Sequence, residues 1–159
     1  MARSGTILGL AKLQKKLDRL PTVARDAIRQ KMAGTADEIV AMMKRLAPVL
    51  KEPDDRRRAG ALRDSIGWTW GQAPKGSMVI ASIKGAGIGG DLTITIFAGS
   101  RDKGRGTDDA FYARWVEFGT QNMPAQPYFY VSWRANKRRA GRQVRAAVRR
   151  AARDVAKGQ

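Results

Sequence analysis

Two periods of hydrophobic and polar positions run along the chain, one typical of helices and the other typical of strands. Between Thr22 and Pro48, apolar residues recur at every third or fourth position, which predicts a helix that Thr22 caps and Pro48 ends. A helix of about 25 residues is roughly 37 Å long and needs a broad surface to pack on. Its predicted apolar face comprises Ile28, Met32, Ile39, Met43 and Leu46. A shorter amphipathic helix is expected within 1–21, because Pro21 stops a stripe of leucines.

The middle of the chain has the pattern of short strands. Strands are predicted at 66–70, 77–84 and 91–99, and in the last of these Ile94 and Ile96 alternate with threonines. Such alternation is typical of a sheet with one buried face and one wetter face. A short helix should follow, capped by one of the aspartates at 108 and 109 and closed at its other end by a glycine at 119.

The last helix, expected over 134–159, has two stripes on opposite faces. The apolar stripe comprises Val144, Val148, Ala151 and Val155, and the basic stripe comprises Arg138, Arg142, Arg145, Arg149 and Arg153. Together these elements predict an α+β fold, in which a long N-terminal helix and a C-terminal helix pack with a three- to four-stranded antiparallel sheet. The length of 159 residues and the hydrophobic content of 43% predict one domain over 1–159.

Charge is the strongest feature of the composition. The chain has 31 Lys and Arg against 14 Asp and Glu, a formal charge of +17, and more than half of that excess lies from Arg134 onward. Such a balance favours nucleic acid, a membrane surface or an acidic protein as a partner. The basic stripe can follow a phosphate backbone or contact an acidic surface. Nothing in its pattern predicts reading of bases, so any DNA contact should be independent of sequence.

The composition also excludes several kinds of chemistry. There is no Cys and no His, which removes disulfides, thiol nucleophiles and imidazole-based triads. The sequence "GAGIGG" at 85–90 matches a dinucleotide fingerprint only in its letters, because a strand and not a helix is expected after it. The acidic "EPDD" at 52–55 is followed by three arginines, which favours surface ion pairs over a metal site. We therefore expect no enzyme activity, cofactor or metal.

A second basic segment follows the last predicted strand. "GSRDKGRG" at 99–106 has glycines spaced as in a phosphate-binding loop, but the required Lys and Ser/Thr are missing. Arg101, Lys103 and Arg105 remain as candidates for contact with phosphate or an acidic partner, and a solvated turn is the equal alternative.

Residues 112–130 hold six of the eleven aromatic residues of the chain and are interrupted by glycine and prolines. Aromatic side chains are enriched at subunit interfaces, and prolines stiffen a connection at low entropic cost. The alternative is an Ω-like turn packed under its own sheet. Glu117 is the only acid between Asp109 and Asp154, and we expect it to pair with an arginine of the same or another subunit. The interface candidates are Trp115, Glu117, Phe118, Gly119, Thr120, Pro124, Pro127 and Tyr128.

Three segments in this order resemble the tail-completion and head–tail joining proteins of long-tailed bacteriophages. They are "KRLAPV" at 44–49, "GALRDSI" at 60–66 and "YARWVEFGTQNMPAQPYFYVSWRANK" at 112–137. The most specific part is "VEFGT" followed by "MPAQP". The chain departs from that family in the bulk of Arg114 and Trp115 and in the arginine content of its last helix.

The resemblance implies a structural protein of the virion, made in the cytoplasm of the host bacterium and placed at the neck or the head-proximal end of the tail. It implies a homo-oligomeric ring, six-fold to match the tail tube, that completes the tail and joins it to the head. Expected neighbours are portal, adaptor or stopper, terminator and tube proteins, with non-specific contact to genomic DNA in the lumen and none to a membrane. The alternative that charge alone supports is a sequence-independent nucleic-acid-binding protein.

Overall fold

The computed structural model describes residues 22–50, 58–82, 92–99, 110 and 112–157. Four predicted features lie outside these residues, namely the helix within 1–21, the acidic segment 52–55, the glycine-rich segment 85–90 and the basic loop with Arg101, Lys103 and Arg105.

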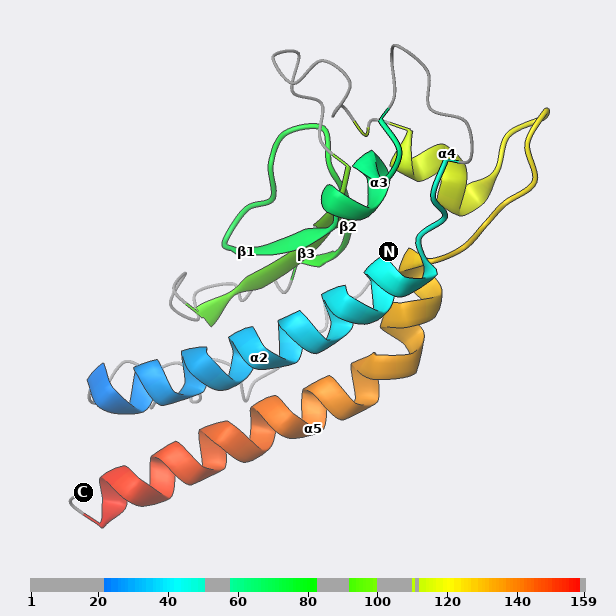
Figure 1. Ribbon diagram of the computed structural model, residues 1–159. Helices are drawn as coiled ribbons and strands as arrows, with labels where there is room; N and C mark the ends of the chain where they lie inside the picture. Colours follow the sequence, from blue (N-terminus) through cyan, green and yellow to red (C-terminus); the bar gives the residue numbers. More distant parts are fainter. Residues whose placement is uncertain (1–21, 51–57, 83–91, 100–109, 111, 158–159) are drawn as a thin grey trace, which may run out of the picture.

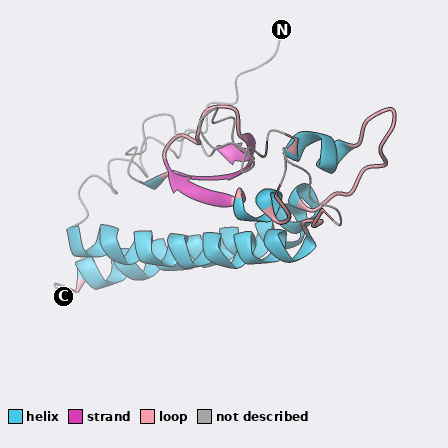
Figure 2. Cartoon of the chain, turned by 45° about the horizontal axis from the view of Figure 1, so that its top comes forward, coloured by secondary structure: helices cyan, strands magenta, loops and turns pink. Residues whose placement is uncertain are grey.

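Two long helices form the base of the molecule. α2 spans Thr22–Leu46 and α5 spans Phe129–Ala156, and they run antiparallel side by side (Figures 1 and 2). Both helices were predicted, and α5 begins five residues earlier than the expected helix over 134–159. The reason is that the first turn of α5 contains aromatic residues that pack into the core, a signal that a search for amphipathic stripes does not detect.

The sheet lies over the same side of both helices (Figure 2). It contains β1 (Gly67–Trp70), β2 (Met78–Ser82) and β3 (Ile94–Ala98) in the order β1-β3-β2, with every pairing antiparallel. The register between β2 and β3 shifts between Val79 and Ala81. The predicted α+β class is therefore confirmed, with three strands in the described part of the chain.

Two short helices complete the described fold. α3 (Ala61–Asp64) leads into β1, and α4 (Ala113–Phe118) precedes the loop that connects to α5. The predicted end of α4 at Phe118 is confirmed. The predicted aspartate cap is wrong, because the N-cap residue of α4 is Tyr112 and the aspartates at 108 and 109 lie outside the described residues.

The core has two parts along α2. One part surrounds Met43 and includes Tyr128 and Phe129 at the start of α5. The other joins Ile28 and Met32 to the apolar stripe of α5. Of the predicted face of α2, four residues are buried and Leu46 is not, since it is 46% exposed. At this end of the helix the buried side passes through Met43 and Ala47, one turn apart, and Leu46 points away from it.

Polar contacts fix the sheet to α2 at the edge strand β1. The Trp68 indole N–H donates to Asp37 Oδ1 at 2.7 Å, and the guanidinium of Arg29 lies 4.5 Å from the ring centre of Trp70. A cation over an indole face adds attraction to the area that the ring buries. The two tryptophans, which the sequence showed only as strand residues, therefore orient the sheet on the helix.

The packing of α2 on α5 can be tested at Ile28. Ile28→Ala removes three carbons from a fully buried position and should lower the free energy of unfolding by about 2–5 kcal/mol. Leu46→Ala at the exposed end of the same helix should cost under about 1 kcal/mol. Urea titration followed by circular dichroism measures both, and equal losses would contradict the described core.

Candidate functional site

The site is built around Glu117 of α4, which is a charged residue only 3% exposed. Its Oε2 accepts hydrogen bonds from the backbone N–H groups of Tyr128 at 2.9 Å and Phe129 at 2.8 Å, and its Oε1 accepts from Tyr130 at 2.9 Å. These N–H groups belong to the start of α5, where a helix has no internal acceptors for them. The carboxylate also lies at the positive end of the helix dipole.

α5 has no cap of its own. Its N-cap residue is Tyr128, which makes no side-chain capping bond, and its first turn contains no acid. Glu117, eleven positions upstream, takes that role. The expected arginine partner of Glu117 is therefore wrong for the described residues, because all of its hydrogen bonds go to the backbone of α5. The sequence contains no pattern by which a glutamate that caps a distant helix differs from a glutamate that pairs with an arginine.

The loop 119–127 is closed at its base by backbone hydrogen bonds. Gln126 N–H donates to the Val116 carbonyl at 2.8 Å, while Thr120 and Met123 exchange N–H···O bonds of 2.9 and 3.2 Å. Gly119 starts the loop at φ 76° and ψ 176°, a conformation nearly confined to glycine. A Cβ there would approach Met123 O within 2.9 Å. The loop extends away from the body with a defined shape (Figure 1).

Exposed aromatic side chains lie next to this loop. Trp115 and Phe118, one turn apart on α4, are 50% and 57% exposed, and the Phe118 ring lies 5.6 Å from the half-buried ring of Tyr130. We call Trp115, Phe118 and Tyr130 the aromatic patch. Its Phe118 and Tyr130 also line a hollow of about 310 Å³ that reaches to Val79 on β2.

The structure separates the predicted interface residues into two groups. Trp115, Phe118, Thr120, Pro124 and Pro127 are exposed, and Gly119 is half-buried at the base of the loop. Glu117 and Tyr128 are buried in the chain, which corrects their place in the predicted set, since a neighbouring subunit could not touch them in this conformation. Glu117 and Tyr128 lie in the interior, beneath the exposed residues of this segment.

Tyr128 is a buried residue of the core. Burial raises the pKa of its hydroxyl well above the ordinary value of a tyrosine, and the nearby charge of Glu117 raises it further. The hydroxyl is consequently neutral at physiological pH. The Tyr128 carbonyl accepts from the hydroxyl of Ser132 at 2.6 Å, which continues the polar connection into the first turn of α5.

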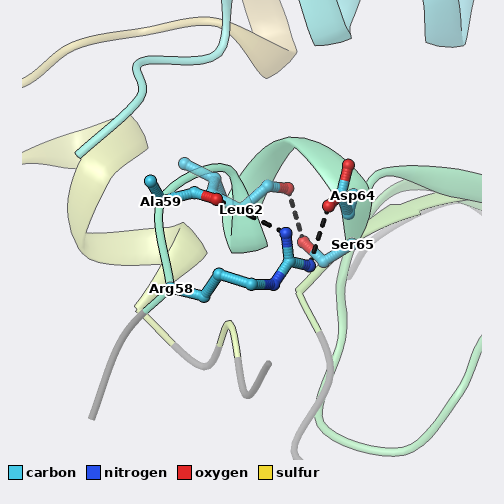
Figure 3. Close-up of polar contacts among 5 residues, drawn as sticks. All are labelled: Arg58, Ala59, Leu62, Asp64 and Ser65. Carbon is cyan, nitrogen blue, oxygen red and sulfur yellow. Dashed lines mark hydrogen bonds and ion pairs between the residues drawn. The ribbon is translucent and has the colours of Figure 1, made fainter. Parts of the chain in front are cut away.

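The "LRDS" part of the resemblance forms a second polar cluster. Arg58 donates to Asp64 at 2.8 Å, and Ser65 Oγ donates to the Leu62 carbonyl at 2.7 Å (Figure 3). The same Ser65 oxygen accepts from Gly99 N–H at 3.0 Å. These contacts tie α3 to the end of β3, so this motif maintains the fold and has no visible chemical role.

The basic stripe predicted for the last helix is confirmed as a geometric feature of α5. Its five arginines are exposed, while the opposite stripe packs on α2. Among the described residues no group of three or more His, Cys, Asp or Glu side chains could hold a metal ion. No helix in that part of the chain is long and apolar enough to cross a membrane.

The cap can be tested with Glu117→Gln, which keeps the size of the side chain. An amide offers one acceptor oxygen in place of two, so at least one buried N–H of α5 should lose its partner, and the free energy of unfolding should fall by about 1–3 kcal/mol. Glu38→Gln removes an exposed carboxylate paired with Arg139 and should cost under about 1 kcal/mol. Thermal or urea unfolding of the monomer measures both. An unchanged Glu117→Gln protein would show that the cap contributes nothing.

Comparison with known proteins gives a match to a family model. Residues 11–119, more than half of the chain, match the family model described as "Bacteriophage HK97-gp10, putative tail-component". The match ends at Gly119, so "MPAQP" and the arginine-rich α5 lie beyond it. No curated protein and no solved structure was found to match. The resemblance to phage tail proteins is confirmed, and the chain belongs to the HK97-gp10-like family of phage tail components.

Proposed function

We propose that this protein forms a homo-oligomeric ring at the neck or head-proximal end of a phage tail, where it completes the tail and joins it to the head. Membership of a tail-component family supports a structural role in the virion. The ring, its six-fold symmetry and its contacts with portal, adaptor, stopper, terminator or tube proteins are the proposal. No catalytic step belongs to it.

The observation that carries the proposal is the aromatic patch next to the loop 119–127. Trp115 and Phe118 are 50% and 57% exposed, and exposed apolar patches mark sites of protein contact. Aromatic residues of this kind often contribute most of the binding energy of an interface. The closed loop beside them has little conformational entropy to lose when a neighbour binds.

Glu117 gives the surface its rigidity. By capping α5 it fixes the angle between α4 and α5, and therefore the relative positions of Phe118 and Tyr130. A surface that keeps one shape before and after assembly suits a closed ring, because each subunit must present the same contact to the next.

Deletion of the gene from a phage that carries it tests the role in assembly. Electron microscopy of the lysate should show filled heads beside complete, unattached tails, since each half of the virion assembles without the joining ring. Overlong tails would indicate instead that the protein controls the length of the tail. Normal infectious particles would contradict the proposal altogether.

The proposed interface has its own test in the purified protein. Phe118→Ser should convert the oligomer to monomer in sedimentation velocity. The free energy of unfolding should change by less than about 1 kcal/mol, because the phenyl group of Phe118 is mostly in solvent. Leu46→Ser, at a residue of comparable exposure on α2, is the matched control and should leave the oligomer intact. Dissociation by Leu46→Ser alone would move the interface away from the aromatic patch.

A further inference from the structure

The outward face of α5 has a continuous line of arginines that is not part of the proposed ring interface. All of them are exposed and spaced by three or four residues, so they share one side of the helix. The line covers nineteen residue steps, or about 28 Å. We call it the arginine row, and it consists of Arg134, Arg138, Arg142, Arg145, Arg149 and Arg153.

The charges of the arginine row are not balanced by the described residues around it. The only acid of α5 is Asp154, and Glu38 of α2 pairs with Arg139, which lies to the side of the row. Within the described ranges, no carboxylate forms an ion pair with a member of the row. The row is thus a positive surface that a polyanion would complement.

The spacing makes this surface costly for an isolated helix. Arg138 and Arg142, and likewise Arg145 and Arg149, stand four residues apart on the same face. Like charges at that spacing destabilise a helix by a few tenths of a kcal/mol per pair. A bound line of negative charge would remove this repulsion and add charge-assisted hydrogen bonds, which guanidinium groups form well with phosphate.

We propose that the arginine row binds the phosphate backbone of double-stranded DNA without reading its sequence. Its length of about 28 Å corresponds to roughly eight base pairs at 3.4 Å each. Several phosphates therefore lie within reach of the row at once. This binding surface goes beyond the proposed ring function and does not require the ring, because the row lies on α5 beyond the residues of the aromatic patch.

The amide side chains of α5 are not available to read adenine. Asparagine and glutamine are the residues that recognise adenine in the major groove. Asn136 donates to the Ser132 carbonyl and contacts Met42, and Gln143 lies 2.9 Å from the hydroxyl of Thr35. Both amides of α5 are thus engaged inside the chain, and neither is available on the outward face.

The same face argues against an acidic protein as the partner. A specific protein interface has an apolar core surrounded by a polar rim. The exposed large hydrophobic residues of the described chain lie elsewhere, and on α5 the only one is Val131, which precedes the row. Attraction along the row is consequently electrostatic over its whole length, as expected for contact with phosphates.

Fluorescence anisotropy with a labelled DNA duplex of about 20 base pairs and mixed sequence tests the proposal. The row variant carries Arg142→Gln, Arg145→Gln and Arg149→Gln. The matched control carries Arg45→Gln, Arg63→Gln and Lys75→Gln, which also lowers the formal charge of +17 by three at exposed positions. Affinity is measured as a function of salt, and circular dichroism verifies that both variants keep their helices.

We expect the row variant to lose affinity by roughly 10- to 100-fold and its salt slope to fall by about 3, one for each phosphate contact removed. The control should bind within about 3-fold of the unaltered protein, because non-specific charge contributes little. Duplexes of different sequence should bind equally.

Two results would overturn the proposal. Equal losses in the row variant and the control would show that net charge alone attracts DNA. The second result comes from a competition experiment, in which polyglutamate displaces the labelled duplex at a lower concentration of charge than unlabelled duplex does. That result would assign the row to an acidic protein. Either result would leave the ring proposal standing, since the variants do not alter the aromatic patch.

Discussion

The structure depends on one contact, the carboxylate of Glu117 at the N-terminus of α5. A helix of 28 residues with no capping side chain in its own first turn would fray at the end that enters the core. Glu117 satisfies three N–H groups there from a neighbouring helix, and its negative charge offsets the positive end of the helix dipole. This contact joins α4, the loop 119–127 and α5 into one unit.

Two surfaces with different chemistry result from this unit. The aromatic patch lies at the start of α5, where the cap holds α4 against it, and the arginine row follows the rest of the helix. The row is tolerable because the other side of α5 buries valines against α2, and apolar burial outweighs a few repulsive pairs at the surface. Packing on one face therefore permits a uniform charge on the other.

The family match and the fold agree on which parts are shared with phage tail components. The matched residues include α2, the "LRDS" cluster, the sheet and α4 up to Gly119. α5 lies outside the match, although Glu117 inside it caps that helix. In this chain the helix that follows the matched residues is arginine-rich and is capped from within them.

The sequence by itself determined the elements and their order. Periodic apolar residues placed α2, the strands and α5, and the density of arginines identified a basic face, because both signals come from neighbours along one chain segment. Only the tertiary structure decided the role of Glu117, the burial of Tyr128 and the exposure of Leu46. Each of these depends on which segments meet in space. A hydrogen bond from a backbone N–H to a side chain eleven residues away leaves no periodic pattern in the sequence.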